Sequence, residues 1–184
     1  YQEAIHYAFV DPAMQARLFP DSDPVRLANP IAADLAVMRT SLWPGLLKGA
    51  IENQRRQQER VRLFEIGAVF EKAGAGAVRE LRRVAGIALG PRLPEQWGTK
   101  AEGLDFFDLK SDVTAILELN NSSQDVDIIN ESIACLHPGR AAVVKRAGAA
   151  IGWFGELHPQ WVRELELPVT PLLFELDLEA ATRH

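Results

Sequence analysis

The sequence predicts an α+β fold in which an antiparallel sheet is flanked by helices. Segments with the two-residue alternation of strands outnumber segments with helical periodicity. Helical segments separate only some of the strands, so there is no regular βαβ rhythm that would indicate a parallel sheet. The 184 residues, 47% of them hydrophobic, can bury the core of one domain. We expect a single domain over residues 1–184, excised from a longer chain because the sequence begins with Tyr1 rather than Met.

Composition disfavours several classes of protein. The formal net charge of −5 disfavours a broad nucleic-acid-binding face, because phosphate neutralisation supplies most of the affinity of such a face. Cys135 is the single cysteine, so no internal disulfide can form, and we expect a cytoplasmic protein. No apolar run approaches the roughly 18 residues that a membrane span requires, so we expect no membrane partner.

The first part of the chain contains short predicted elements. Ile5–Val10 alternates loosely, as a strand does. Asp11 followed by Pro12 is typical of a helix N-cap and first turn, so a helix should run to about Phe19. Val25–Ala28 should form another short strand.

The clearest helix runs from Leu42 to Gln57. The following residues recur at a spacing of three and four positions and so share one face: Trp43, Leu46, Leu47, Ala50, Ile51 and Gln54. Thr40 or Ser41 can cap the first turn, where Pro44 is tolerated because that turn's amide groups have no intrahelical partner. Burying the large apolar side chains of this face would contribute roughly 6–10 kcal/mol as an upper estimate, so the helix must dock against something.

A hairpin should follow this helix. Val61–Phe70 has apolar residues on both faces of a predicted strand, which indicates a central strand that is covered on both sides. A glycine turn at Gly74–Gly76 leads to a returning strand at Arg83–Leu89. The two strands should therefore pair in antiparallel fashion.

The second half contains both kinds of element. Phe107–Leu119 is an amphipathic helix, which we expect Asn120–Ser123 to end. The remaining predicted elements are a strand at Val126–Ile129, a hairpin of Ala141–Lys145 with Ala150–Gly155 around Gly148, a helix at Pro159–Leu165 and a strand at Leu172–Leu178.

Two groups of polar residues contain side chains of the types that bind metal ions. Asp105, Asp108 and Asp112 begin the second amphipathic helix, where the macrodipole favours acids, and we prefer that interpretation to a metal site. A Cys-x-His pair without a second pair is poor zinc spacing. The second group is Cys135, His137 and His158, and we expect both histidines, each followed by a proline, to lie in turns rather than at a metal.

Two groups of arginines flank the predicted hairpin, and either could meet phosphate groups. They are Arg55, Arg56, Arg60 and Arg62, and Arg79, Arg82 and Arg83. Glutamates are interleaved with both groups, at Glu52, Glu59, Glu65 and Glu80. We therefore favour a salt-bridged surface over contact with nucleic acid.

Six blocks of the sequence resemble the β chain of bacterial phenylalanyl-tRNA synthetases, in order and over essentially the whole chain. One block alone would be unspecific, whereas six in order are specific. They are Leu27–Leu47 (LANPIAADLAVMRTSLWPGLL) with Asn53–Arg55, Arg62–Gly67 (RLFEIG), Phe106–Lys110 (FFDLK), Leu136–Gly139 (LHPG), Ile151–Gly155 (IGWFG) with His158-Pro159, and Phe174–Leu176 (FEL).

The resemblance implies the class II aminoacyl-tRNA synthetase fold in its catalytic-like form. It also implies an α subunit as partner in an (αβ)2 assembly, with Leu42–Gln57 matching a helix at the subunit interface. The expected interface residues are Arg39, Leu42, Trp43, Leu46, Leu47, Ile51, Gln54 and Arg55. Aspartate at Leu46 and Leu47 should then reduce α–β assembly more than it reduces folding.

Departures from the active class II pattern imply a module without chemistry of its own. An active site of this class has Arg-x-Glu in its second motif, and that arginine binds the ATP α-phosphate. In this chain Arg62 and Glu65 are one residue too far apart, and Phe64 stands in the arginine's place. The third motif, which ends in arginine, is absent, and Gly152–Glu156 is its nearest approach. Without those cations nothing offsets the charge on ATP phosphates, so we expect no catalytic, cofactor-binding or metal residues here.

These expectations combine into one hypothesis and two alternatives. The hypothesis is a non-catalytic structural domain that supports α–β assembly, while the holoenzyme uses ATP and magnesium to attach phenylalanine to tRNA. The first alternative is a synthetase-core paralogue that binds an amino acid or related metabolite on an open sheet face. The apolar residues Phe64, Ile66, Ala68 and Phe70 argue for a filled pocket and against this alternative. The second is direct tRNA contact through residues 55–62, where we expect weak or no contact because the family recognises the anticodon in another domain.

Overall fold

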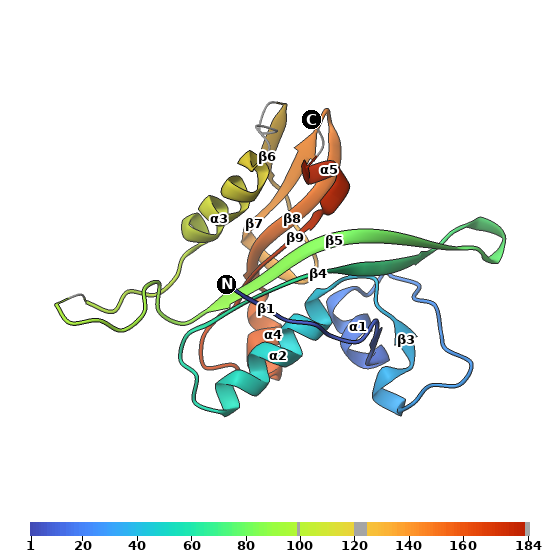
Figure 1. Cartoon of the computed structure of the whole chain (residues 1–184), viewed down its shortest axis with the longest axis horizontal. Helices are drawn as coiled ribbons and strands as arrows, with labels where there is room; N and C mark the ends of the chain where they lie inside the picture. Colours follow the sequence, from blue (N-terminus) through green and yellow to red (C-terminus); the bar gives the residue numbers. More distant parts are fainter. Residues whose placement is uncertain (99, 120–124, 183–184) are drawn as a thin grey trace.

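The chain folds around one seven-stranded sheet in a computed structural model, which describes residues 1–98, 100–119 and 125–182 (Figure 1). The strand order is β1-β4-β5-β9-β8-β7-β6. Every neighbouring pair is antiparallel except β1 with β4, which confirms the predicted α+β class. The strands are β1 Gln2–Glu3, β4 Val61–Lys72, β5 Val78–Leu89, β6 Val126–Asn130, β7 Leu136–Arg146, β8 Ala149–Leu157 and β9 Leu172–Asp177.

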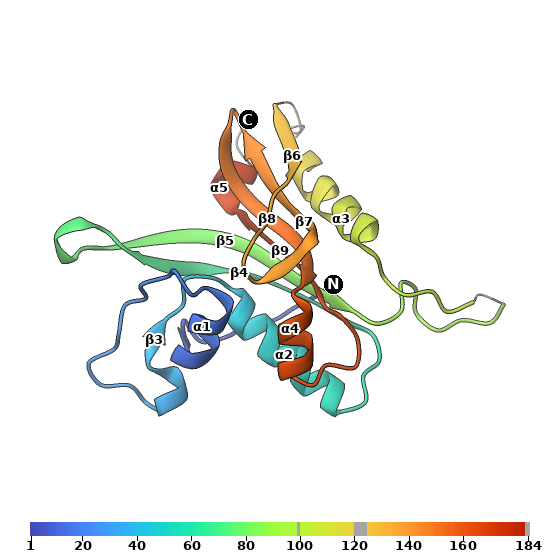
Figure 2. The same cartoon turned by 180° about the vertical axis from the view of Figure 1, so that it is seen from behind.

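Helices cover both faces of this sheet, as Figures 1 and 2 show from opposite sides. On one face lie α1 (Pro12–Leu18), α2 (Trp43–Arg55) and α4 (Pro159–Glu164), which share an apolar core with the sheet. On the other face lie α3 (Phe106–Glu118) and α5 (Leu178–Thr182), which share a second core. None of the helices in the described part of the chain is long and apolar enough to cross a membrane.

The N-terminal segment departs from its predicted structure. Of the strand predicted at Ile5–Val10, only Phe9–Val10 forms one, β2, which pairs with β3 (Val37–Met38) in a separate two-stranded sheet. Residues 4–8 cross over α2 instead, and the amide of Ala4 donates to the Phe64 carbonyl at 2.7 Å. The strand expected at Val25–Ala28 is reduced to one bridge between Arg26 and Val37.

Two helices start as their sequences predict. The Asp11 carboxylate accepts from the amide of Ala13 at 2.9 Å, so α1 has the predicted N-cap. Asp105 and Asp108 form a reciprocal capping box at the start of α3. Both acids therefore lie at the N-terminal end of the helix, where the macrodipole favours them, and the capping box itself was not predicted. The predicted end of α3 at Asn120–Ser123 lies outside the described residues.

The β4–β5 hairpin is the longest pairing in the fold. Its register runs without a shift from Val61 opposite Leu89 to Lys72 opposite Val78, around a single 3-10 turn at Gly74–Gly76. However, β4 lies beside the two-residue strand β1 and is therefore close to the sheet edge. The expectation of a central strand covered on both sides is corrected accordingly, since Ile66 on the face opposite α2 is 42% exposed.

Candidate functional site at helix α2 and on the opposite sheet face

The apolar face of α2 packs against the chain's own sheet. Leu42, Trp43, Leu46 and Leu47 each have 0% exposure, and the Trp43 indole N–H donates to the Phe174 carbonyl at 2.9 Å. These four side chains have no surface left for another subunit. Their expected role at an interface is thus corrected, because the partner that their burial demands is the sheet itself. Aspartate at Leu46 or Leu47 would disrupt the fold before it affected assembly.

The other expected interface residues differ in how much surface they offer. Arg39 is buried, Ile51 and Gln54 are partly buried, and Arg55 is exposed. The apolar side chains that do reach solvent over α2 are those of Ile5 and Tyr7, which are 87% and 71% exposed, and no sequence pattern had indicated them.

Between Ile5 and Tyr7, His6 points inward onto α2. A Cβ atom added at Gly45 would come within 2.8 Å of His6 Cγ, and one at Gly49 within 3.1 Å of His6 Nε2. The two glycines therefore let residues 4–8 lie directly on the helix. Because neighbouring residues of an extended segment point to opposite sides, the inward His6 turns its two apolar neighbours outward.

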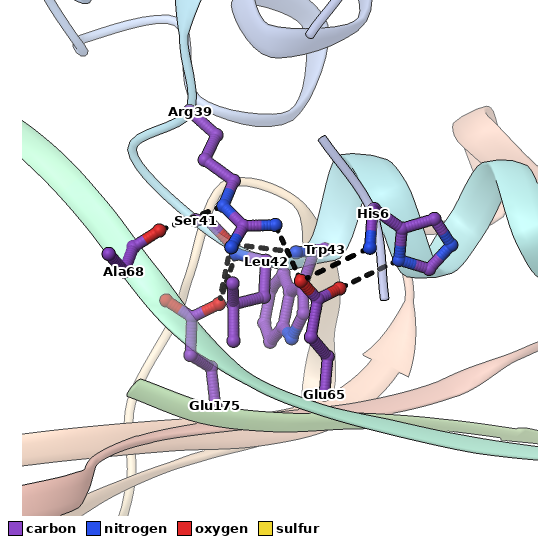
Figure 3. Close-up of polar contacts among 8 residues, drawn as sticks. All are labelled: His6, Arg39, Ser41, Leu42, Trp43, Glu65, Ala68 and Glu175. Atoms are coloured by element: carbon purple, nitrogen blue, oxygen red, sulfur yellow. Dashed lines mark hydrogen bonds and ion pairs between the residues drawn. The ribbon is translucent and has the colours of Figure 1, made fainter. Parts of the chain in front are cut away.

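A buried polar network anchors the start of α2 to the sheet (Figure 3). Arg39 Nη1 lies 2.7 Å from Glu65 Oε1, and Arg39 Nε donates to the Ala68 carbonyl at 2.8 Å. His6 Nδ1 lies 2.7 Å from the other Glu65 oxygen. Burial alone would raise the pKa of Glu65, but the His6 hydrogen bond and the Arg39 charge outweigh it and hold the pKa below its ordinary value. Glycine at position 67 leaves room for the guanidinium, which a Cβ atom would overlap.

A second carboxylate, that of Glu175 in β9, accepts hydrogen bonds from the residues that begin α2 (Figure 3). Glu175 Oε2 accepts from Ser41 Oγ at 2.7 Å and from the Leu42 amide at 2.8 Å. Burial raises the pKa of Glu175, opposed by the charge of Arg83 and by these hydrogen bonds. Ser41 Oγ also accepts from the Trp43 amide at 3.1 Å, so one of the two predicted capping residues does satisfy a first-turn amide. Nothing in the local sequence around residue 175 indicated this role.

The remnant of the second class II motif has no free cation. Arg62 and Glu65 point to opposite faces of β4, since they are three residues apart in a strand. Arg62 donates to three backbone carbonyls, those of Val61, Leu89 and Pro91, at 2.9, 2.6 and 2.8 Å. Burial lowers the pKa of Arg62, and the nearby charge of Arg60 adds to this.

Aromatic rings fill the sheet face opposite α2. The Phe174 ring lies directly on Gly86, which pairs with Phe64, and a Cβ atom at Gly86 would overlap that ring. Tyr1 meets Phe174 edge to face, with 6.2 Å between ring centroids. Phe106 of α3 stacks on Phe154 of β8 at 5.2 Å. Rings from four segments therefore cover this face around Gly86 and Phe154, whereas Ile66, one of the apolar residues expected to fill the face, is 42% exposed.

Of the two histidines predicted to lie in turns, His158 directly precedes α4, whereas His137 lies within strand β7, so the prediction is wrong for His137. His158 Nδ1 accepts from the Gln160 amide at 3.1 Å and so caps α4, and His137 Nδ1 accepts from the Gly139 amide at 3.0 Å. Cys135 is buried, and burial raises the pKa of its thiol to about 12.

The arginines are paired differently from the prediction. Arg79 and Arg83 both approach Glu71, at 2.6 and 3.6 Å. Glu65 pairs with Arg39 rather than with an arginine of either group. Within the described residues, no ion pair involves these predicted members of the salt-bridged surface: Arg55, Arg56, Arg60, Arg62, Arg82, Glu52, Glu59 and Glu80. The predicted salt-bridged surface is therefore wrong for the first arginine group.

Comparison with solved structures supports the fold. Two structures of pyrrolysyl-tRNA synthetase from Desulfitobacterium hafniense match 98% of this chain. Their TM-scores are 0.70 and 0.71, at 17% and 18% identity, and the match covers 62% and 59% of those chains. At this identity the likeness concerns the fold, which is that of a class II synthetase core.

Comparison with curated sequences supports the family. The chain is 48% identical to the phenylalanine–tRNA ligase β subunit of Methylococcus capsulatus over 180 residues and 46% identical to that of Nitrosococcus oceani over 184 residues. These matches cover 98% and 100% of this chain but only 22% and 23% of those relatives. A family model described as the phenylalanyl tRNA synthetase beta chain CLM domain matches residues 1–178. The chain therefore belongs to the family of phenylalanyl-tRNA synthetase β chains, as their CLM domain.

Proposed function

We propose that this domain is a structural support in a cytoplasmic phenylalanine–tRNA ligase and performs no adenylation itself. In this role it holds an α subunit within an (αβ)2 assembly, and the α subunit uses ATP and magnesium to attach phenylalanine to tRNA. The observation that carries the proposal is the filled sheet face. Phe174 lies on Gly86, and the one arginine of the second-motif remnant is tied to backbone carbonyls. ATP phosphates or an amino acid would therefore meet a filled face and a guanidinium already held by backbone carbonyls.

The catalytic part of the proposal is tested by pyrophosphate exchange with ATP and phenylalanine. We expect the 184-residue chain alone to give no exchange, whereas the assembled α and β subunits give exchange under the same conditions. Adenylate formation by the chain alone would contradict the proposal. An amino acid or related metabolite that co-purifies with the chain would favour the paralogue alternative instead.

The interface part of the proposal is placed on the outer side of α2. Ile5 and Tyr7 are the large apolar side chains exposed there, and adjacent exposed apolar groups are typical of interaction surfaces. Arg55 at the end of the helix is also exposed, and Ile51 and Gln54 are partly exposed. The buried residues of α2 then act indirectly, by fixing the helix on the sheet.

Serine at both Ile5 and Tyr7 in the full-length β chain tests this placement. We expect co-purification with the α subunit to fall while the β chain's unfolding midpoint stays unchanged, because both side chains are exposed. Ile31, which is 83% exposed on a separate loop, provides the matched control as Ile31→Ser. Equal α-subunit recovery with the double variant and with the control would refute the placement.

A further inference from the structure

We propose that a hollow at the outer edge of β4 binds a phosphate group, supplied either by an RNA backbone or by free phosphate. The hollow has a volume of about 230 Å³ and lies where the start of β4 meets β1 and the end of α2. The polar residues that line it are Tyr1, Gln2, Asn53, Gln58, Arg60 and Arg62. None of the residues that line it is acidic, although the whole chain has a net charge of −5.

Arg62 places a buried positive charge at this hollow. The residue is 7% exposed, and its guanidinium donates to three carbonyl oxygens. Three carbonyls accept from its N–H groups, but within the described residues no carboxylate lies at ion-pair distance from Arg62. A buried cation of this kind is costly unless an anion approaches it.

The acids that act on Arg62 from farther away are already engaged. Asp108 lies 3.0 Å from Arg92, and Asp112 accepts from the Tyr1 hydroxyl at 2.7 Å. Both belong to α3, and neither lines the hollow. They reduce the electrostatic cost of Arg62 without filling the space beside it.

Arg60 adds a second guanidinium that has no carboxylate partner among the described residues. Its charge lowers the pKa of Arg62, so the two groups repel each other. Cations near the end of a helix are often explained by the macrodipole, but α2 ends at Arg55, and that effect fades within the last turn. Repulsion between two positive groups beside one hollow is relieved by an anion between them.

Phosphate fits this hollow better than a larger ligand does. Pockets for drug-sized molecules measure about 300–1,000 Å³, which is more than this hollow offers. Arginine forks match the oxygens of a phosphate group. The side-chain amides of Gln2 and Gln58 make no hydrogen bond within the described part of the chain, so their N–H groups are available to further phosphate oxygens.

The test compares Arg60→Ala with Arg82→Ala in the 184-residue chain. Arg82 is also exposed and without an ion pair in the described residues, but it lies beside a different hollow, lined by Glu80, Asp177 and Glu179. Calorimetric titration with inorganic phosphate and fluorescence anisotropy with a short single-stranded RNA serve as the two probes. We expect Arg60→Ala to weaken binding about tenfold and Arg82→Ala to leave it unchanged.

Salt dependence distinguishes the two sources of phosphate. If an RNA backbone reaches the hollow, raising KCl from about 50 to about 200 mM weakens RNA binding, and Arg60→Ala reduces the slope of log K against log salt by about one. Saturable binding of inorganic phosphate without RNA binding assigns the hollow to free phosphate. Absence of saturable binding for both probes, or equal effects of the two substitutions, overturns the proposal. The α-subunit recovery assay does not depend on this hollow, so failure of either proposal is recognised separately.

Discussion

Removing the guanidinium of Arg39 should be one of the most damaging single changes in this domain. Arg39→Met keeps an unbranched side chain of similar length but deletes the ion pair to Glu65 and the hydrogen bond to the Ala68 carbonyl. The side chains of Arg39 and Glu65 are only 6% and 4% exposed, so water cannot replace the lost partner. Among the described residues, Glu65 would keep His6 as its single charged or hydrogen-bonding partner.

The expected cost follows from this burial. Breaking a buried ion pair by removing one member costs about 3–5 kcal/mol, because the other charge is left uncompensated. The lost bond to Ala68 leaves a carbonyl without its partner, which adds about 1 kcal/mol. A domain of this size has a total stability of about 5–15 kcal/mol, so the variant should approach the limit of folding. Adding Glu65→Gln removes the orphaned charge and should recover part of the loss.

Urea unfolding followed by tryptophan fluorescence measures these free energies, and all four members of the double-mutant cycle are needed. We expect a coupling energy between the two substitutions of about 1–3 kcal/mol. Arg82→Met, at an exposed position, is the control and should change stability by less than about 0.5 kcal/mol. A loss below about 1 kcal/mol for Arg39→Met, or strict additivity in the cycle, would refute the reasoning.

Two further predictions concern pH. The pKa of Glu65 is lowered in the folded state, so its contribution to stability is present above the ordinary pKa of about 4.3 and is lost as pH falls through the folded-state pKa. Glu65→Gln should therefore flatten the acid limb of a plot of stability against pH, and an unchanged limb would count against this prediction. Burial raises the pKa of Cys135 to about 12, so the stability of the domain should fall as pH rises from about 9 towards that value. A thiol reagent at neutral pH should label Cys135 in the unfolded chain but not in the folded chain, and rapid labelling of the native chain would contradict the burial.

Local patterns in the sequence were sufficient to predict most of the helices and strands. The Asp11 cap, the acids at the start of α3 and the glycine turn between β4 and β5 depend on contacts within a few residues, so a local pattern was enough to predict them. The apolar face of α2 was equally clear. The sequence did not show what covers that face, because a stripe of large side chains indicates burial but does not say whether the same chain or another one buries it.

The polar network at the start of α2 shows why part of the site was beyond sequence reasoning. His6, Arg39, Glu65 and Glu175 come from four separate segments, and Glu65 pairs with Arg39 across 26 positions rather than with the arginines nearby in sequence. Ser41 and Glu175 are 134 positions apart. No periodicity links residues at such separations, because their proximity depends on strand order and register.

By itself, the sequence determined the α+β class, the family resemblance and the absence of the second-motif spacing that active class II sites require. These depend on residue identity and on short-range periodicity. Only the tertiary structure decided that Leu42, Trp43, Leu46 and Leu47 face the domain's own sheet, and that Ile5 and Tyr7 take the outer position over α2. The physical reason is that burial is a property of the packed chain, since each apolar face is covered by whichever segment the sheet topology brings to it.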